Sequence, residues 1–275
     1  MGAHDRAADA SVEAAVPPAA APAGDIAGLS SRAGEAEPAI PAEPYELDDD
    51  FSGLACAEGL MTVAGFGSLL SETSARSTFP QLRNFRQGRL RGWRRVFAHQ
   101  CDIFFARGIA RPETREVSSL SVEEHPGSEI VVSLFEVEAT PASVAAFIER
   151  EHEFRFVAVE PLRFECGSPI GRRAVVCARW NDDEYRWRRC PPHEWQRRYG
   201  KHGVTQIWTD DVLPCRVYLR HCVLAAQRLG PAAFQSFLDE TYLADRVTTV
   251  RQHLAANPGI LQELPPPSLI GRYSG

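Results

Sequence analysis

The hydrophobic pattern divides the chain into a polar first segment and a strand-rich body. Residues 1 to about 50 show no hydrophobic period, and they contain the Ala/Pro-rich run from Pro17 to Gly24 followed by many acidic residues. Such a segment cannot bury enough apolar surface to offset the entropy of ordering. We therefore expect residues 1–57 to be a disordered acidic tail and residues 58–275 to form the folded domain.

Apolar and β-branched runs predict a sheet in the first half of the domain. The expected strands are residues 61–66, 87–98, 117–122 and 130–139. The last of these is too continuously apolar for an exposed edge strand, which indicates a closed or nearly closed sheet. Residues 71–85 mix polar and apolar positions and contain Phe79-Pro80, so we expect a loop there with at most one helical turn.

The clearest helix is predicted over residues 140–151. Thr140 is a suitable N-cap and Pro141 suits the first helical position, after which Val144 and Phe147 fall on one face. Residues 154–159 then follow the pattern of a strand, which leaves Glu151 at a helix-to-strand junction. Further helices are expected over residues 212–229, 232–243 and 246–255, with Gly230-Pro231 separating the first two.

Residues 163–211 form a segment rich in arginine and tryptophan. We expect a strand over residues 172–180, a helix over 192–199 and a short β-prone stretch over 204–208. Basic and aromatic side chains together can bind single-stranded nucleic acid. Acidic residues interleave with them here, which favours arginines that are solvated or stacked on tryptophan. No nucleic-acid partner is expected.

Composition limits the class of protein. The 275 residues are 44% hydrophobic and 9% aromatic, enough to fill a core, and the net charge of −6 is concentrated in the first segment. The sequence contains no apolar run that approaches the length of a membrane span, nor the pattern of a secretory or transit peptide. Seven cysteines are an odd number without a regular framework, so we expect reduced thiols and a cytoplasmic location.

Metal and cofactor sites find little support in the sequence. Cys190, His193, His202 and Cys215 carry ligand atoms for zinc, but their spacings match no usual zinc motif. Cys222 neighbours His221, and adjacent side chains diverge on a helix, so they cannot act as a nucleophile and base. A dinucleotide fold would require glycine where Leu70 stands. We expect no metal and no cofactor.

Two stretches remain as candidates for chemistry. The strand at residues 61–66 ends in Gly67-Ser68, a small-residue turn whose backbone amides can face a carboxylate or phosphate, although an ordinary tight turn is the simpler interpretation. Three acids, Glu149, Glu151 and Glu153, cluster at the end of the predicted helix. Helical spacing would place Glu149 and Glu153 on one face and Glu151 on another.

Taken together, four blocks resemble the γ-glutamylcyclotransferase-like family, including its ChaC-type glutathione-specific members. They are Gly65-Phe66-Gly67-Ser68-Leu69, similar to the family's Tyr-Gly-Ser-Leu or Tyr-Gly-Ser-Asn signature; the strand Gly88 to Phe97, similar to Gly-x-x-x-Gly-Trp-Arg-Arg-x-Phe; Phe147 to Glu151, similar to Leu-Asp-x-Arg-Glu; and Pro214 to Tyr218, similar to its Pro-x-x-x-Tyr helix. Together the blocks cover most of residues 61–243, and their order and spacing make the resemblance more specific than any single block.

The resemblance implies an α+β fold built on a small mixed β-barrel with flanking helices. It also implies an enzyme that releases 5-oxoproline from a small γ-glutamyl peptide or amine, without metal or cofactor. The substrate's α-amine attacks its own side-chain amide carbonyl, so the protein supplies a base rather than a nucleophile. By the same resemblance Glu151 is the general acid/base, and Phe66, Gly67, Ser68, Leu69 and Tyr218 bind the substrate.

The chain departs from the family pattern at several positions. Phe66 and Phe154 stand where tyrosine is usual, which removes two hydroxyl groups, and Cys215 and His152 replace other common residues. The alternative hypothesis is therefore a non-catalytic member of the same fold that binds a small ligand or a protein. A carboxylate of Glu151 that faces the Gly67-Ser68 turn across a cavity would favour the enzyme.

Overall fold

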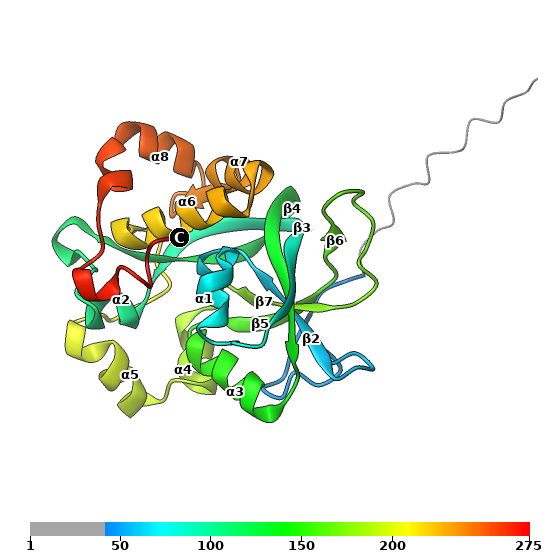
Figure 1. Ribbon diagram of the computed structural model, residues 1–275. Helices are drawn as coiled ribbons and strands as arrows, with labels where there is room; N and C mark the ends of the chain where they lie inside the picture. Colours follow the sequence, from blue (N-terminus) through cyan, green and yellow to red (C-terminus); the bar gives the residue numbers. More distant parts are fainter. Residues whose placement is uncertain (1–41) are drawn as a thin grey trace, which may run out of the picture. The chain divides into compact units, whose positions relative to one another are not determined.

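The computed structural model describes residues 42–275, and one mixed sheet organises them. The main strand order is β1-β5-β7-β2-β4-β3-β6, with β8 beside β4 and β9 beside β3. The strands are β1 Tyr45–Glu46, β2 Leu60–Gly65, β3 Arg83–Gln100, β4 Glu116–Glu138, β5 Arg155–Val159, β6 Leu162–Arg163, β7 Ala174–Ala178, β8 Leu213–Pro214 and β9 Thr241–Leu243. The sheet is a curled half-barrel with helices around it (Figure 1). The predicted α+β class is confirmed.

The helices are short apart from α6. They are α1 Glu72–Arg76, α2 Asp102–Ala106, α3 Pro141–Arg150, α4 Asp182–Arg188, α5 Pro192–Arg198, α6 Arg216–Leu229, α7 Pro231–Asp239 and α8 Val250–Ala256. Five 3-10 helices, η1 Ser68–Leu70, η2 Pro112–Thr114, η3 Gly200–His202, η4 Pro258–Gln262 and η5 Pro267–Leu269, complete the described chain. No described helix combines the length and apolar character that crossing a bilayer requires.

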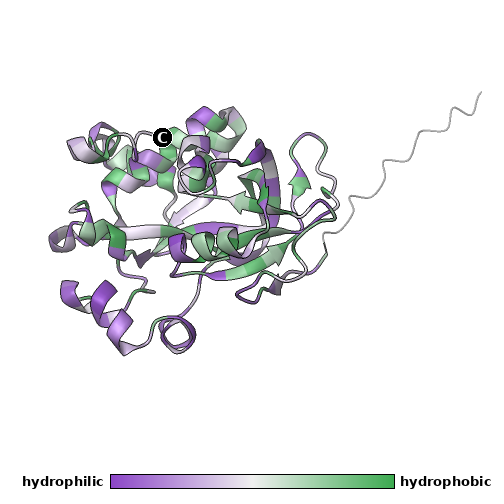
Figure 2. Cartoon of the chain, turned by 60° about the horizontal axis from the view of Figure 1, so that its bottom comes forward, coloured by the Kyte–Doolittle hydropathy of each residue, from purple (hydrophilic) through white to green (hydrophobic). Residues whose placement is uncertain are grey.

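The sheet is dominated by the antiparallel pair of β3 and β4. The expected strands at residues 117–122 and 130–139 belong to one long strand, β4, which pairs with β3 on both sides of an irregularity at residues 125–128. Beside this irregularity, Arg94 of β3 lies opposite Glu123 of β4 and forms an ion pair with it at 2.6 Å. The ion pair helps to hold the two strands together where few apolar side chains do so. Hydrophobic residues concentrate in the strands, while the outer turns of the helices are hydrophilic (Figure 2).

Several expected elements differ in the structure, among them the helix expected over residues 246–255, which begins at Val250. The helix expected over residues 212–229 begins at Arg216, because Leu213–Pro214 pairs with β4 instead. The helix expected over residues 232–243 ends at Asp239, since the β-prone Thr241–Leu243 adds a parallel strand to β3. Helix α4 was not anticipated, because its charged sequence buries only Tyr185 and so shows no apolar period.

Part of the expected tail packs on the domain. Strand β1 pairs with β5, and the ring of Phe51 contacts Phe147 and Phe156 with centroids 6.1 and 5.0 Å apart. Leu47 and Leu54 are buried as well. These three isolated apolar residues attach residues 42–57 to the domain. They are too few to give a hydrophobic pattern in the sequence, which is why the stretch resembles a tail. The rest of the expected tail, residues 1–41, lies outside the described residues.

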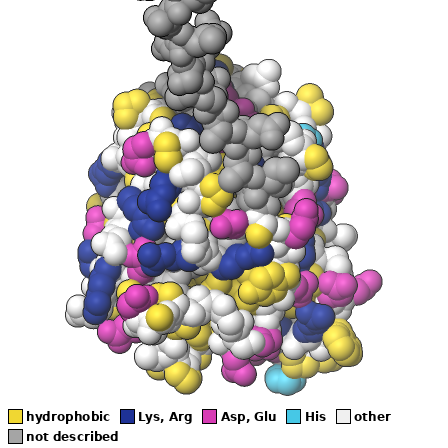
Figure 3. Space-filling model, turned by 90° about the vertical axis from the view of Figure 1, so that its right-hand side faces the viewer, with side chains coloured by type: hydrophobic (Ala, Val, Ile, Leu, Met, Phe, Trp, Pro, Cys, Tyr) yellow, Lys and Arg dark blue, Asp and Glu magenta, His cyan; other side chains and the backbone are white. Residues whose placement is uncertain are grey.

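The charged surface is mixed in sign. The face shown in Figure 3 carries basic and acidic side chains close together. In the Arg/Trp-rich segment, Arg186 lies over the ring of Trp195 at 3.5 Å, and Arg189 lies over Trp180 at 5.2 Å while also pairing with Asp49 at 2.7 Å. These arginines are engaged within the fold, as the stacked interpretation predicts.

Candidate active site

The turn after β2 depends on two glycines for close packing. A Cβ at Gly65 would lie 2.5 Å from Ser133 Oγ, and one at Gly67 would lie 2.9 Å from the hydroxyl of Tyr218. Gly67 has a φ of −124°, so close packing rather than a left-handed backbone requires glycine here. The glycines therefore let β4 and α6 approach the turn closely.

Buried polar side chains hold this turn in place. The Nε of Arg95 donates to the carbonyl of Phe66 at 2.9 Å, and Ser133 Oγ donates to that of Leu69 at 2.7 Å. Arg95 is completely buried, and desolvation lowers its pKa to about 9. The amides of Ser68 and Leu69 begin η1 and so have no acceptor within that helix. Neither amide has a backbone acceptor elsewhere in residues 42–275, so both are available there as donors.

Helix α3 delivers Glu151 to the same region. The N-cap Thr140 accepts a hydrogen bond from Ser143 N at 3.1 Å, and the helix ends at Arg150, so Glu151 is its C-cap. Arg150 links helix and turn: its Nε donates to Glu151 Oε1 at 2.7 Å and its Nη2 to Ser68 Oγ at 3.2 Å. Glu151 Oε2 has no hydrogen-bond partner among residues 42–275.

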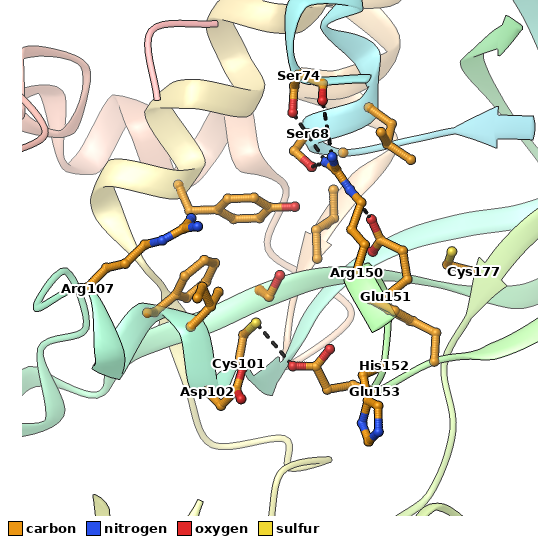
Figure 4. A pocket seen from close by; sticks show the side chains of 18 of the residues that line it. Ser68, Ser74, Cys101, Asp102, Arg107, Arg150, Glu151, His152, Glu153 and Cys177 are labelled. Carbon is orange, nitrogen blue, oxygen red and sulfur yellow. Dashed lines mark hydrogen bonds and ion pairs between the residues drawn. The ribbon is translucent and has the colours of Figure 1, made fainter. Parts of the chain in front are cut away.

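A cavity of about 490 Å³ brings these elements together, a volume typical of small-molecule sites. All the substrate-binding and catalytic residues expected from the sequence line it, namely Phe66, Gly67, Ser68, Leu69, Glu151 and Tyr218. Figure 4 shows the guanidinium of Arg150 between Ser68 and Glu151. The rings of Phe66 and Phe154 meet edge to face with centroids 6.4 Å apart, and both line the cavity without closing it.

The prediction that Glu149 and Glu153 share one helix face is wrong. Glu149 is 70% exposed and pairs with Arg198 at 2.9 Å, whereas Glu153 is only 4% exposed. They do not share a face because α3 ends at Arg150, before Glu153. Glu153 lines the cavity, and its Oε1 accepts hydrogen bonds from Cys101 Sγ and the Tyr199 hydroxyl, each at 3.2 Å.

The surroundings of Glu153 favour its neutral form. Burial, then the Asp102 carboxylate, raises the pKa of Glu153 to about 7, and Glu151 acts in the same direction. The hydrogen bond from Cys101 opposes the rise. The thiol of Cys101 in turn has a pKa well above its usual value, because it is buried beside Glu153. Sequence reasoning missed this group because Cys101, Tyr199 and Glu153 are far apart along the chain.

The cavity also carries unpaired cations. Arg107, Lys201 and Arg272 line it, and within residues 42–275 none of them pairs with a carboxylate. Arg107 instead donates to the hydroxyl of Tyr273 at 2.6 Å, and Arg272 to Ser77 Oγ at 3.3 Å. Burial lowers the pKa of Arg272, with Arg150 and Arg107 adding repulsion. An anionic group of a ligand would relieve this excess of positive charge.

The described residues contain one group of potential metal ligands, which is not the one that the sequence suggested. Within residues 42–275, one group, Cys101, Asp102 and Glu153, brings three potential ligand atoms within 4.8 Å of one another. These groups are already engaged, since Cys101 bonds to Glu153 and Asp102 lies 3.3 Å from Arg198. The Cys and His side chains that the sequence suggested for zinc form no such group among the described residues.

Comparisons with known proteins give weak likenesses. Searches found no matching family model and no matching curated protein. Among solved structures, an uncharacterized human protein is 14% identical with a TM-score of 0.43, covering 74% of this chain and 99% of that one. A γ-glutamyl cyclotransferase is 14% identical with a TM-score of 0.34, covering 50% of this chain and 85% of that one. An Arabidopsis thaliana protein is 14% identical with a TM-score of 0.33, covering 54% and 90%. None of these likenesses carries a function over to this chain.

Proposed function

We propose that this protein is a γ-glutamyl cyclotransferase, which releases 5-oxoproline from a small γ-glutamyl peptide or amine with Glu151 as general acid/base. One observation carries the proposal. Glu151 and the Gly67–Leu69 turn, 82 or more residues apart in sequence, line one cavity and are joined through Arg150. This is the juxtaposition that the resemblance to the family's motifs requires.

The base acts on the substrate's α-amine. At neutral pH this amine is mostly an ammonium, which cannot attack a carbonyl carbon. The Oε2 of Glu151 is free among the described residues, whereas Oε1 is held by Arg150, so the carboxylate is oriented and still able to accept a proton. Once deprotonated, the amine closes a five-membered ring on the γ-carbonyl carbon, and no protein nucleophile takes part.

The substrate's carboxylate needs donors at the other end of the site. The amides of Ser68 and Leu69 begin η1, and the cations Arg107 and Arg272 lack carboxylate partners within residues 42–275. These groups are suited to an α-carboxylate. The same amides, if they face the γ-carbonyl oxygen instead, would stabilise the oxyanion of the tetrahedral intermediate.

The proposal is tested by a panel of substrates. Purified protein is incubated with glutathione, γ-glutamyl dipeptides and γ-glutamyl-lysine, and the release of 5-oxoproline is measured. Turnover of at least one member is expected. The alternative, a non-catalytic binding module, predicts that a γ-glutamyl compound shifts the thermal unfolding midpoint while no 5-oxoproline appears.

A further inference from the structure

Glu153 is a second carboxylate in the cavity that no step above uses. It follows Glu151 by two residues on the turn between α3 and β5, and its side chain points toward Cys101 while His152 points away from both acids (Figure 4). His152 is engaged elsewhere, since its Nδ1 lies 2.8 Å from the hydroxyl of Tyr185. The two glutamates therefore reach one cavity from a single short segment.

The hydrogen bonds that Glu153 accepts all reach one of its two carboxylate oxygens. Within residues 42–275 its two donors, Cys101 Sγ and the Tyr199 hydroxyl, both reach Oε1 at 3.2 Å. Within residues 42–275, Oε2 has no hydrogen-bond partner, although the residue lines the cavity. A neutral carboxyl group carries its proton on one oxygen and accepts at the other. With Oε1 already occupied as an acceptor, the proton belongs on Oε2, the oxygen that is open to a ligand.

The charges around Glu153 also favour a proton there. Asp102 of α2 and Glu151 are like charges, and Cys101 and Tyr199 are neutral donors. Arg198 of α5 pairs with Asp102, Glu149 and Glu194, and Arg150 pairs with Glu151. Arg107, Lys201 and Arg272 also line the cavity, and within residues 42–275 no cation forms an ion pair with Glu153. Tyr185 of α4 and Cys177 of β7 contribute no positive charge.

We propose that Glu153 in its protonated form carries the proton on Oε2 and donates it to the leaving nitrogen, so that the two acids divide the work that a single glutamate would otherwise do. This inference rests on the proposed cyclotransferase function. It assigns Glu151, paired with Arg150, to the attacking amine, and Glu153, paired with no cation, to the departing one. Two carboxyl groups in contrasting environments are the usual arrangement for an acid and a base in one site.

The proton balance closes with these roles. The α-nitrogen begins with three hydrogens and ends, in the lactam, with one; Glu151 accepts one of the lost protons and water accepts the other. As the bond between the γ-carbon and the leaving nitrogen breaks, Glu153 gives that nitrogen one proton, and the released amine takes a second from water. Glu151 has then gained a proton and Glu153 has lost one, so a single exchange through water restores both.

The first test is kinetic and uses Glu153→Gln. Glutamine keeps a carbonyl oxygen for Cys101 and Tyr199 and places an NH₂ at the position of Oε2, so the hydrogen bonds survive while the transferable proton is lost. We expect kcat to fall by about 10²-fold or more and the limb of its pH profile near 7 to disappear, while the thermal midpoint at pH 7 stays at or above that of the wild type, because glutamine has no charge to bury. The matched control is Glu165→Gln, an exposed residue outside the cavity, which should keep wild-type kinetics.

If Glu153 has only a structural role, the kinetics of Glu153→Gln will differ from those expected above. If Glu153→Gln keeps both the wild-type kcat and its pH profile while wild-type protein releases 5-oxoproline, the donor role is overturned and the proposed function stands. If wild-type protein releases no 5-oxoproline from any substrate, the proposed function fails and the donor role fails with it. The two failures are distinguished by the wild-type measurement.

The second test detects the proton on Glu153 directly and does not depend on turnover. Infrared difference spectra of wild-type protein minus Glu153→Gln at pH 6 should contain the C=O stretching band of a protonated carboxyl group, and this band should vanish as the pH rises above about 8. The Glu165→Gln difference spectrum should lack the band. Absence of the band from the Glu153→Gln difference at pH 6 would mean that Glu153 is ionised, which overturns the proposal whatever the kinetics show.

Discussion

At the scale of single residues, two features determine the site: a glycine that allows close packing at the turn, and glutamates that differ in their surroundings. Glu149, Glu151 and Glu153 are chemically identical, yet one is a surface ion pair, one pairs with Arg150 in the cavity, and one is buried beside neutral donors. The difference comes from where α3 ends. A helix one turn longer would have turned Glu153 toward Glu149, as the sequence spacing alone suggested.

Gly67 gives a residue-scale prediction. A Cβ there would lie 2.9 Å from the hydroxyl of Tyr218, a buried side chain, and 3.4 Å from a methyl group of Leu120. Gly67→Ala should therefore destabilise the protein by about 1–3 kcal/mol and raise KM for the γ-glutamyl substrate, because the turn shifts away from α6. Gly271→Ala, with no atom near its Cβ, is the control and should stay within about 0.5 kcal/mol. Chemical denaturation and initial rates measure both, and unchanged stability of Gly67→Ala would contradict the packing explanation.

At the scale of elements, the site is a junction between the turn after β2 and the end of α3. Arg150 makes the junction: besides Glu151 and Ser68, it donates to Thr78 Oγ1 at 2.7 Å and to the carbonyl of Ser74 at 3.1 Å. One planar guanidinium thus fixes α1, the turn and the proposed base together. Lysine cannot reproduce this set, because its ammonium lacks the fork geometry.

Arg150→Lys should accordingly lower kcat/KM for the γ-glutamyl substrate by about tenfold or more, and cost about 1–3 kcal/mol in unfolding free energy from lost hydrogen bonds. Steady-state kinetics and urea denaturation give the two quantities. A variant that loses the stability but retains the full kcat/KM would show that Arg150 is structural only and does not orient Glu151.

Elements with a strong local signal were predictable, and those that depend on tertiary pairing were not. Helix α3 was found from Thr140 and Pro141 with its boundaries nearly correct, because cap and apolar face lie within the helix itself. The sequence of strand β9 predicts the end of a helix, because its strand identity comes only from pairing with β3. The same holds for the site: the motifs indicated Glu151 and the turn, but Lys201, Arg272 and Cys101 reach the cavity through folding alone.

At the scale of the whole molecule, buried titratable groups predict how stability depends on pH. Desolvation lowers the pKa values of His99, His152 and His221 to about 3, 4 and 4, whereas the unfolded chain binds these protons near pH 6.5. Their stabilising effect is complete above about pH 6.5 and is lost as the pH falls toward the native values. Glu153 acts oppositely: its effect is present below about pH 4.3 and is lost as the pH rises through about 7.

Burial also lowers the pKa of His253, so four histidines oppose Glu153, and the thermal midpoint should fall as the pH is lowered from 7 to 5, with each group contributing at most about 1.4 kcal/mol per pH unit. Glu153→Gln removes the opposing group, so its midpoint should fall more steeply over the same range. Calorimetric scans at several pH values measure both slopes. A midpoint that rises on acidification would contradict the burial of these histidines in the neutral form.

The proposed cyclisation requires a base at position 151 that faces the turn across the cavity. The direct measurement is 5-oxoproline release from the best γ-glutamyl substrate by wild-type protein and by Glu151→Gln, with Glu165→Gln as control and thermal midpoints recorded for all three. We predict turnover by the wild type and the control, and a loss of at least about 10²-fold in Glu151→Gln at a nearly unchanged midpoint. Full turnover by a folded Glu151→Gln would contradict the assignment.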